Sequence, residues 1–325
     1  MLCSGKELGI PDEVDGLLLL PADAPVGASI RDYLDLDDTV IELKITPNRA
    51  DCLGMRGIAR EVAALTGASV VMPALSPQAV TLDEQRSVTL AADQACGRYL
   101  GRVIRGVNQA APTPDWMKTR LLRAGLRSIS AIVDITNYIL LEQGQPLHAF
   151  DLAKLEGGIT VRLAAPGETL TLLNGKEQAL DADMLVIADA SKAVALAVIM
   201  GGANSEVDDS TQDIFLESAF FAPEAIAGRA RRLGFSSDAS FRYERGVDFT
   251  LQAEAMERAS ALIVQICGGQ LGPVSEAVGQ LPARAPVSVR VVRWRACCMG
   301  SNSASRRSCD CNPRSMACWC ACFWL

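Results

Sequence analysis

Helix-like and strand-like segments follow one another without a regular rhythm through the middle of this 325-residue chain. SISAIVDITNYILLEQG and FTLQAEAMERASALIVQICGG repeat apolar residues at helical spacing, whereas CGRYLGRVIRGV alternates as a strand does. DMLVIADASKAVALAVIMGG and IFLESAFF add apolar runs of strand length. A parallel sheet needs a helix after nearly every strand, and that order is missing, so the sequence predicts an α+β fold.

One predicted helix places the only histidine of the chain. In SISAIVDITNYILLEQG, Ile132, Ile135 and Ile139 share one stripe, and Gly144 follows as a C-terminal stop. His148 is therefore expected in the loop just after this helix, where functional residues concentrate. By itself a lone histidine is either a hydrogen-bonded structural side chain or a catalytic one, and the residue type leaves both open.

Two further helices have recognisable ends. TPDWMKTRLLRAG is expected to begin with Thr113 as its N-cap and Pro114 at its first position, and to end at Gly125. MRGIAREVAALTG has the apolar spacing of a helix that stops at Gly67. The following stretch, ASVVMPALSPQAVTLDEQ, contains two prolines and is typical of a linker.

The net charge of −7 limits what the chain as a whole can bind. An acidic chain repels polyanions, so any nucleic-acid contact must come from a local basic patch. There is no apolar run of about 18 residues that could cross a membrane. The N-terminus also lacks an apolar signal core, and we therefore expect a cytoplasmic protein with no membrane contact.

Cysteine is spread very unevenly: four residues lie in 1–293 and seven in 294–325. The segment SCDCNPRSMACWCAC allows a thiolate metal site or a disulfide knot, but it shows neither paired spacing nor a hydrophobic period. The alternative is a reading-frame shift in the encoding DNA, which turns a regular segment into one rich in Cys, Ser, Arg and Trp. We favour this alternative, in which residues 294–325 are a misframed tail.

Two short features suggest a ligand site. Glu217 lies inside IFLESAFF, where a carboxylate among apolar residues must be paired or hydrogen-bonded, unless it simply faces solvent from a strand. The glycines of Met200-Gly201-Gly202 end an apolar strand and would let a ligand approach the backbone, unless they form a plain turn.

A segment of 17 residues contains five arginines, although the chain as a whole is acidic. This segment is the one place in the sequence where phosphate binding is plausible. The five arginines are Arg229, Arg231, Arg232, Arg242 and Arg245. The alternative is ordinary surface pairing with Asp238, Glu244 and Asp248. Ser237 beside them could join His148 and an aspartate in a hydrolase triad, but no GxSxG motif supports that reading.

Three blocks taken in series resemble the beta subunit of bacterial phenylalanine–tRNA ligase. They are TPNRADCLGMRGIAREVAALTG, VDITNYILLEQGQPLHAFD and MGGANSEVDDSTQDIFLESAFFAPEAIAGRARRLGFSSDASFRYERGVD. The resemblance covers about residues 1–293 and implies an internal fragment of that subunit.

The resemblance also implies a domain plan. Residues 1–45 would end an oligonucleotide-binding-fold domain that binds tRNA, and residues 46–85 would form a connecting helix and linker. Residues 86–275 would form the central editing domain, a β-sandwich of unusual topology flanked by helices. Residues 276–293 would lead to the next domain.

In that family the central domain hydrolyses tyrosine wrongly attached to phenylalanine tRNA. The resemblance implies catalytic roles for His148, Glu217 and Ser237, and substrate-binding roles for Arg127, Gly201, Ala239 and again Glu217. Ser237 stands where the family usually has threonine, and Phe241 where it often has histidine.

The implied assembly is (αβ)₂, in which the alpha subunit holds ATP and phenylalanine. ATP and magnesium belong to the full ligase, and no metal or cofactor is expected in this chain. It has no Walker or GxGxxG motif, and we therefore expect no aminoacylation without the alpha subunit. The competing hypotheses are a non-catalytic RNA-binding or scaffolding remnant of the subunit, and a misframed product that never assembles.

The frame-shift hypothesis makes a prediction about the encoding DNA. Translation in another frame after about Arg293 should continue an amphipathic segment without the cysteine excess. Reading the two other frames of the DNA checks this. Early stop codons and low-complexity text in both frames would overturn the hypothesis.

Overall fold

A computed structural model describes residues 4, 5, 7, 17–173 and 175–283. The chain divides into two compact units, Met1–Lys44 and Ile45–Leu325. In the first unit, the described residues form helix α1 (Ile30–Tyr33) and an isolated bridge between Ser4 and Leu17. They form no strand, and the oligonucleotide-binding fold expected here stays a prediction. The cysteine-rich tail lies outside the described residues.

The second unit has the expected mixed α+β architecture. A four-stranded antiparallel sheet has the order β11 (Gln270–Val278), β2 (Cys96–Arg105), β10 (Asp213–Phe221) and β3 (Leu147–Asp151). A five-stranded sheet has the order β1 (Val88–Leu90), β4 (Ile159–Leu163), β7 (Leu185–Ala188), β8 (Ala193–Leu196) and β9 (Met200–Gly201). Strands β5 (Thr169–Thr171) and β6 (Glu177–Ala179) form a third, two-stranded sheet.

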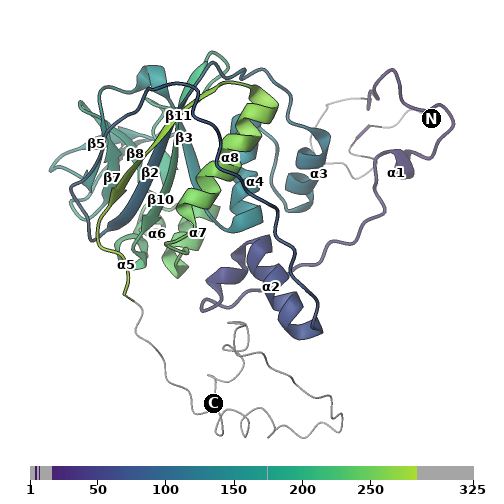
Figure 1. The fold of residues 1–325 in the computed structure, drawn as a ribbon, viewed down its shortest axis with the longest axis horizontal. Helices are drawn as coiled ribbons and strands as arrows, with labels where there is room; N and C mark the ends of the chain where they lie inside the picture. The colour runs from purple at the N-terminus through teal and green to yellow at the C-terminus, as the bar shows by residue number, and fades with distance from the viewer. Residues whose placement is uncertain (1–3, 6, 8–16, 174, 284–325) are drawn as a thin grey trace, which may run out of the picture. The chain divides into compact units, whose positions relative to one another are not determined.

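Helices cover one face of the four-stranded sheet (Figure 1). They are α4 (Ala131–Gln143) and α8 (Gln252–Cys267), and α3 (Asp115–Arg123) packs against α4. The other helical segments described in the unit are η2 (Ala50–Leu53), α2 (Met55–Thr66), η3 (Leu152–Lys154), α5 (Pro223–Ile226), α6 (Arg229–Arg232) and α7 (Asp238–Arg245). Among the helices of the described ranges, none combines the length and apolarity needed to cross a membrane.

The two-residue period of β10 separates two hydrophobic cores. Ile214 and Leu216 pack with residues of α4 and α8 on the helical side. Phe215 and Ala219, which have the opposite parity, pack with β4, β7 and β8 on the other side. Because successive side chains of a strand point to opposite faces, Glu217 belongs to the face that meets the five-stranded sheet.

The helix predicted from its isoleucine stripe is confirmed as α4. Ile132, Ile135 and Ile139 are fully buried, and Gly144 ends the helix in the left-handed conformation with φ of 81°. The prediction that His148 lies in a loop is wrong, because β3 begins at Leu147 and includes it. Only residues 144–146 connect the helix to the strand, and sheet pairing with β10 then extends the backbone.

The N-cap predicted for α3 is also wrong by one residue. The N-cap is Pro114, which makes no side-chain cap bond. The Thr113 hydroxyl instead donates to Oδ2 of Asp134 at 2.6 Å. Asp134 is fully buried and also accepts from the Ser128 hydroxyl and, at 2.9 Å, from the Ile129 amide. One carboxylate in α4 thus satisfies three donors that flank α3 and α4.

This arrangement predicts a large loss of stability on removing the carboxylate. Asp134→Ala leaves one buried and two partly buried donors without their acceptor and should lower the free energy of unfolding by about 2–3 kcal/mol. Urea unfolding of the chain measures the change. Asp209→Ala, which removes an exposed carboxylate outside any helix, is the control and should change it by less than about 0.5 kcal/mol. Equal effects of the two substitutions would contradict the argument.

Candidate functional site

A cavity of about 140 Å³ opens between the two larger sheets, next to α7. Five of the six residues predicted for the site line it: His148, Gly201, Glu217, Ser237 and Ala239. The rest of the lining is largely apolar and comprises Pro146, Leu147, Ile187, Ala195, Leu196, Val198, Ile199, Met200, Phe221 and Tyr243. The sixth predicted residue, Arg127, is exposed in the loop between α3 and α4 and does not line this cavity.

Glu217 is a buried acid, and it does not face bulk solvent. Its exposed fraction is 6%, and its Oε2 accepts a hydrogen bond from the Tyr99 hydroxyl at 3.0 Å. Burial raises the pKa of the Glu217 carboxyl to about 8, and the Tyr99 bond opposes this rise only partly. The cavity therefore presents a carboxyl that exchanges its proton close to neutral pH.

His148 lies directly opposite Glu217 in the register of β3 and β10. Its Nε2 has no hydrogen-bond partner among the described residues, and its ring meets Phe150 edge to face with centroids 4.5 Å apart. Burial lowers the pKa of the imidazole to about 4, which keeps it neutral at physiological pH. A histidine retained only for structure would be expected to have its polar atoms satisfied, and this buried nitrogen is not.

Gly201 makes the position of the imidazole possible. A Cβ atom added there would lie 2.8 Å from Cε1 and 2.9 Å from Nε2 of His148. The backbone nearby is unusual as well, since Val198 has a φ of 70°, in the left-handed region that a β-branched residue rarely adopts. In this wall of the cavity, residues 198–201, the backbone at Gly201 lies directly against the His148 ring.

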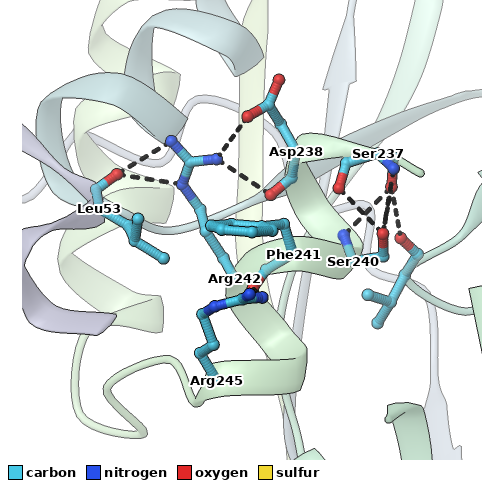
Figure 2. Close-up of polar contacts among 8 residues, drawn as sticks. Leu53, Ser237, Asp238, Ser240, Phe241, Arg242 and Arg245 are labelled. Atoms are coloured by element: carbon cyan, nitrogen blue, oxygen red, sulfur yellow. Dashed lines mark hydrogen bonds and ion pairs between the residues drawn. The ribbon is translucent and has the colours of Figure 1, made fainter. Parts of the chain in front are cut away.

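Ser237 begins helix α7 and completes a capping box (Figure 2). Its hydroxyl accepts from the Ser240 amide at 3.1 Å, and the Ser240 hydroxyl accepts from the Ser237 amide at 3.1 Å. The hydroxyl also approaches the Val198 carbonyl at 3.5 Å. Within the part of the chain that the structure describes it makes no bond to His148, so the hydrolase triad considered from the sequence is not assembled.

The arginines do not form one phosphate cluster. Arg242 is buried and donates to the Leu53 carbonyl and to Asp238, while Arg245 lies over the Phe241 ring (Figure 2). Of the remaining arginines of this group, Arg229 pairs with Asp183, and Arg232 pairs with Asp181 and Asp183. Pairing with carboxylates, the alternative interpretation, therefore holds for Arg229, Arg232 and Arg242, although only Asp238 was among the expected partners.

Sequence reasoning missed Tyr99, the hydrogen-bond partner of Glu217. The alternation of CGRYLGRVIRGV places it on one face of a strand, but only the pairing of β2 with β10 shows which acid it meets. The described ranges contain no group of three or more His, Cys, Asp or Glu side chains placed to hold a metal ion. The polar side chains that line the cavity are thus the Glu217 acid, the His148 imidazole and the hydroxyls of Ser237 and Tyr243, in a wall that is otherwise largely apolar.

The fold and the cavity define an α+β domain with a polar pair enclosed between two sheets. A profile of the B3/4 domain family matches residues 95–268, which are 174 of the 325 residues. The chain belongs to the B3/4 domain family.

The relatives confirm the resemblance found in the sequence. Over 293 residues the chain is 67% identical to a phenylalanine–tRNA ligase beta subunit of Chromobacterium violaceum, and over 293 residues it is 60% identical to that of Dechloromonas aromatica. Each match covers 90% of this chain and 37% of the relative, so the chain spans little more than a third of their length.

A solved N-terminal fragment of a phenylalanyl-tRNA synthetase beta subunit from Pyrococcus horikoshii is more distant. It is 15% identical, and the match covers 75% of this chain and 70% of that one with a TM-score of 0.39. This value is too low to support an argument about topology.

The pKa shifts of the polar pair predict how stability changes with pH. Glu217 holds its proton more tightly in the folded chain, so its contribution to stability falls as pH rises from about 4.5 to about 8. The lowered pKa of His148 acts in the opposite direction: stability rises as pH increases from about 4 to about 6.5, and changes little above that range. Between pH 6.5 and 8, Glu217→Gln should abolish a fall of roughly 1–2 kcal/mol in the free energy of unfolding.

Urea unfolding of wild type and variant at the two pH values measures this difference. Glu177→Gln, at an exposed carboxylate in β6, is the matched control and should keep the wild-type slope. A Glu217→Gln variant whose slope equals that of wild type would show that the carboxyl is not held protonated by burial.

Proposed function

We propose that this cavity is the editing site of a phenylalanine–tRNA ligase beta subunit, where the ester of tyrosine with phenylalanine tRNA is hydrolysed. The observation that carries the proposal is the buried Glu217 carboxyl, which lies opposite a neutral His148 in a small, mostly apolar cavity. The named relatives are beta subunits of this ligase, which supports the assignment of the enzyme class.

The chemistry of the two amino acids explains why such a site is useful. Tyrosine differs from phenylalanine by one hydroxyl, and an apolar synthetic pocket rejects an added hydroxyl only about 10²-fold. A second site that binds the hydroxyl reverses the preference. Glu217 is suited to accept this hydrogen bond, and a phenylalanine ring would leave the carboxyl without that partner at a cost of about 1–3 kcal/mol.

The reaction itself asks little of the protein. An aminoacyl ester is reactive, so a positioned water and a stabilised oxyanion suffice without a covalent nucleophile. The imidazole of His148, whose Nε2 has no partner among the described residues, can orient this water or the terminal ribose as a neutral hydrogen-bonding group. The Ser237 hydroxyl and the small Ala239 and Gly201 complete the wall around the aromatic ring.

The remaining assignments come from the resemblance and its relatives. We infer that the chain acts in the cytoplasm in an (αβ)₂ assembly, with ATP, magnesium and phenylalanine bound by the alpha subunit. The central domain would be the β-sandwich of unusual topology implied by the family. Arg127, exposed and outside the cavity, would contact the tRNA rather than the amino acid.

Two substitutions should separate recognition from hydrolysis. Glu217→Ala should lower the ratio of tyrosyl- to phenylalanyl-tRNA deacylation by roughly 5- to 100-fold, because only Glu217 is asked to recognise the hydroxyl. His148→Ala should slow the deacylation of the two esters equally and leave their ratio unchanged, because the imidazole is proposed to position the water or the ribose that both esters need. The rates are measured for the chain with and without added alpha subunit, with circular dichroism as the control for folding.

Glu177→Ala removes an exposed strand carboxylate outside the cavity and should leave both rates unchanged. If wild type deacylates neither ester in either condition, the chain is the non-catalytic remnant. Wild-type rates in folded His148→Ala would make the histidine structural.

A further inference from the structure

Tyr99 contacts the Glu217 carboxyl from the protein interior. It is fully buried in β2, between the two sheets, and does not line the cavity. Its hydroxyl donates to Oε2 of Glu217 at 3.0 Å. Among the described residues this is the one hydrogen bond made by the Glu217 carboxyl, so Oε1 remains for a ligand.

The register of the sheet explains why the tyrosine can reach the acid. Glu217 pairs with Gly101 of β2, and Ala219 pairs with Tyr99, so Tyr99 is the diagonal neighbour of Glu217 on the same face. The glycine directly opposite has no side chain, and the Phe215 ring occupies the space where its Cβ would be. The Phe215 ring therefore fills the space beside the Glu217 carboxyl that a polar side chain at position 101 would otherwise occupy.

We propose that Tyr99 is a positioning residue that fixes the Glu217 carboxyl, so that one oxygen is held from behind and the other meets the hydroxyl of the ligand. The proposal rests on the proposed function and deepens it: discrimination between tyrosine and phenylalanine depends on a pair, Tyr99 and Glu217, rather than on the acid alone. The phenol of the ligand then donates a hydrogen bond to Oε1 of Glu217, as the phenol of Tyr99 does to Oε2.

The pair also makes recognition depend on pH. The ionised carboxyl accepts both phenols, and the Tyr99 bond favours this form against burial. The other titratable groups around the acid are His148 on β3, Cys96 on β2 and Tyr243 on α7. All three are uncharged at neutral pH, because burial lowers the pKa of the imidazole and raises those of the thiol and the phenol. Tyr99 is therefore the side chain that favours the ionised acid.

The test is the variant Tyr99→Phe, which removes one hydroxyl and keeps the ring. The ratio of tyrosyl- to phenylalanyl-tRNA deacylation is measured from pH 6.5 to 8.5, with spontaneous hydrolysis subtracted. In wild type the ratio should rise with pH as Glu217 ionises. In Tyr99→Phe it should be roughly two- to tenfold lower at neutral pH, and its rise should move to higher pH.

Tyr138→Phe is a matched control. The Tyr138 hydroxyl donates to Oε1 of Glu142 at the same distance of 3.0 Å, and also accepts from Arg120 at 2.8 Å, at a place remote from the cavity lining. Removing it tests whether the loss of any buried phenol bonded to a carboxylate disturbs editing. The control should keep both the wild-type ratio and its pH profile.

A second measurement does not require editing at all. Without Tyr99 the folded chain should hold the Glu217 proton to higher pH, so the fall in stability seen by urea unfolding should extend to a higher pH than in wild type. If wild type shows no preference for either ester, the proposed function fails while this shift still tests the pair. A Tyr99→Phe variant that matches wild type in both pH profiles overturns the proposal.

Discussion

Strand β10 has no free edge and no free face, and the rest of the second unit is arranged around it. It pairs with β2 on one edge and β3 on the other, and it packs against helices on one side and the five-stranded sheet on the other. A polar side chain in such a strand needs a partner or a cavity, because burial without either is costly. Glu217 has both, and for this reason the candidate site lies beside it.

Burial acts in opposite directions on the two facing groups and leaves both uncharged near neutral pH. It raises the pKa of Glu217 to about 8 and lowers that of His148 to about 4. A cavity lined by neutral groups suits an uncharged aromatic side chain and offers nothing to a phosphate. This agrees with the positions of the arginines, none of which lines the cavity and three of which are paired with carboxylates.

Local patterns predicted the elements well, and long-range pairing decided the site. The stripe of α4 and its stop at Gly144 depend on neighbours in sequence, so they could be read directly. The strand position of His148 depends on β10, which lies about 65 residues further along, and a loop was the natural expectation from local signals. Tyr99 could not be linked to Glu217 without the register of β2. All six site residues were grouped by the family resemblance, since nothing in spacing alone joins them, and five of the six line the cavity.

The Ser237 hydroxyl supports the fold of α7 whatever else it does. It accepts from the Ser240 amide, and an N-cap of this kind contributes about 1 kcal/mol. A threonine, which the resemblance leads one to expect there, would offer the same oxygen. Because Ala239 and Tyr243 of α7 also line the cavity, removing the hydroxyl disturbs the site through the helix as well as directly. The more informative side chains are therefore those, such as Glu217, that hold no helix end in place, and for them unfolding measurements separate an effect on stability from one on recognition.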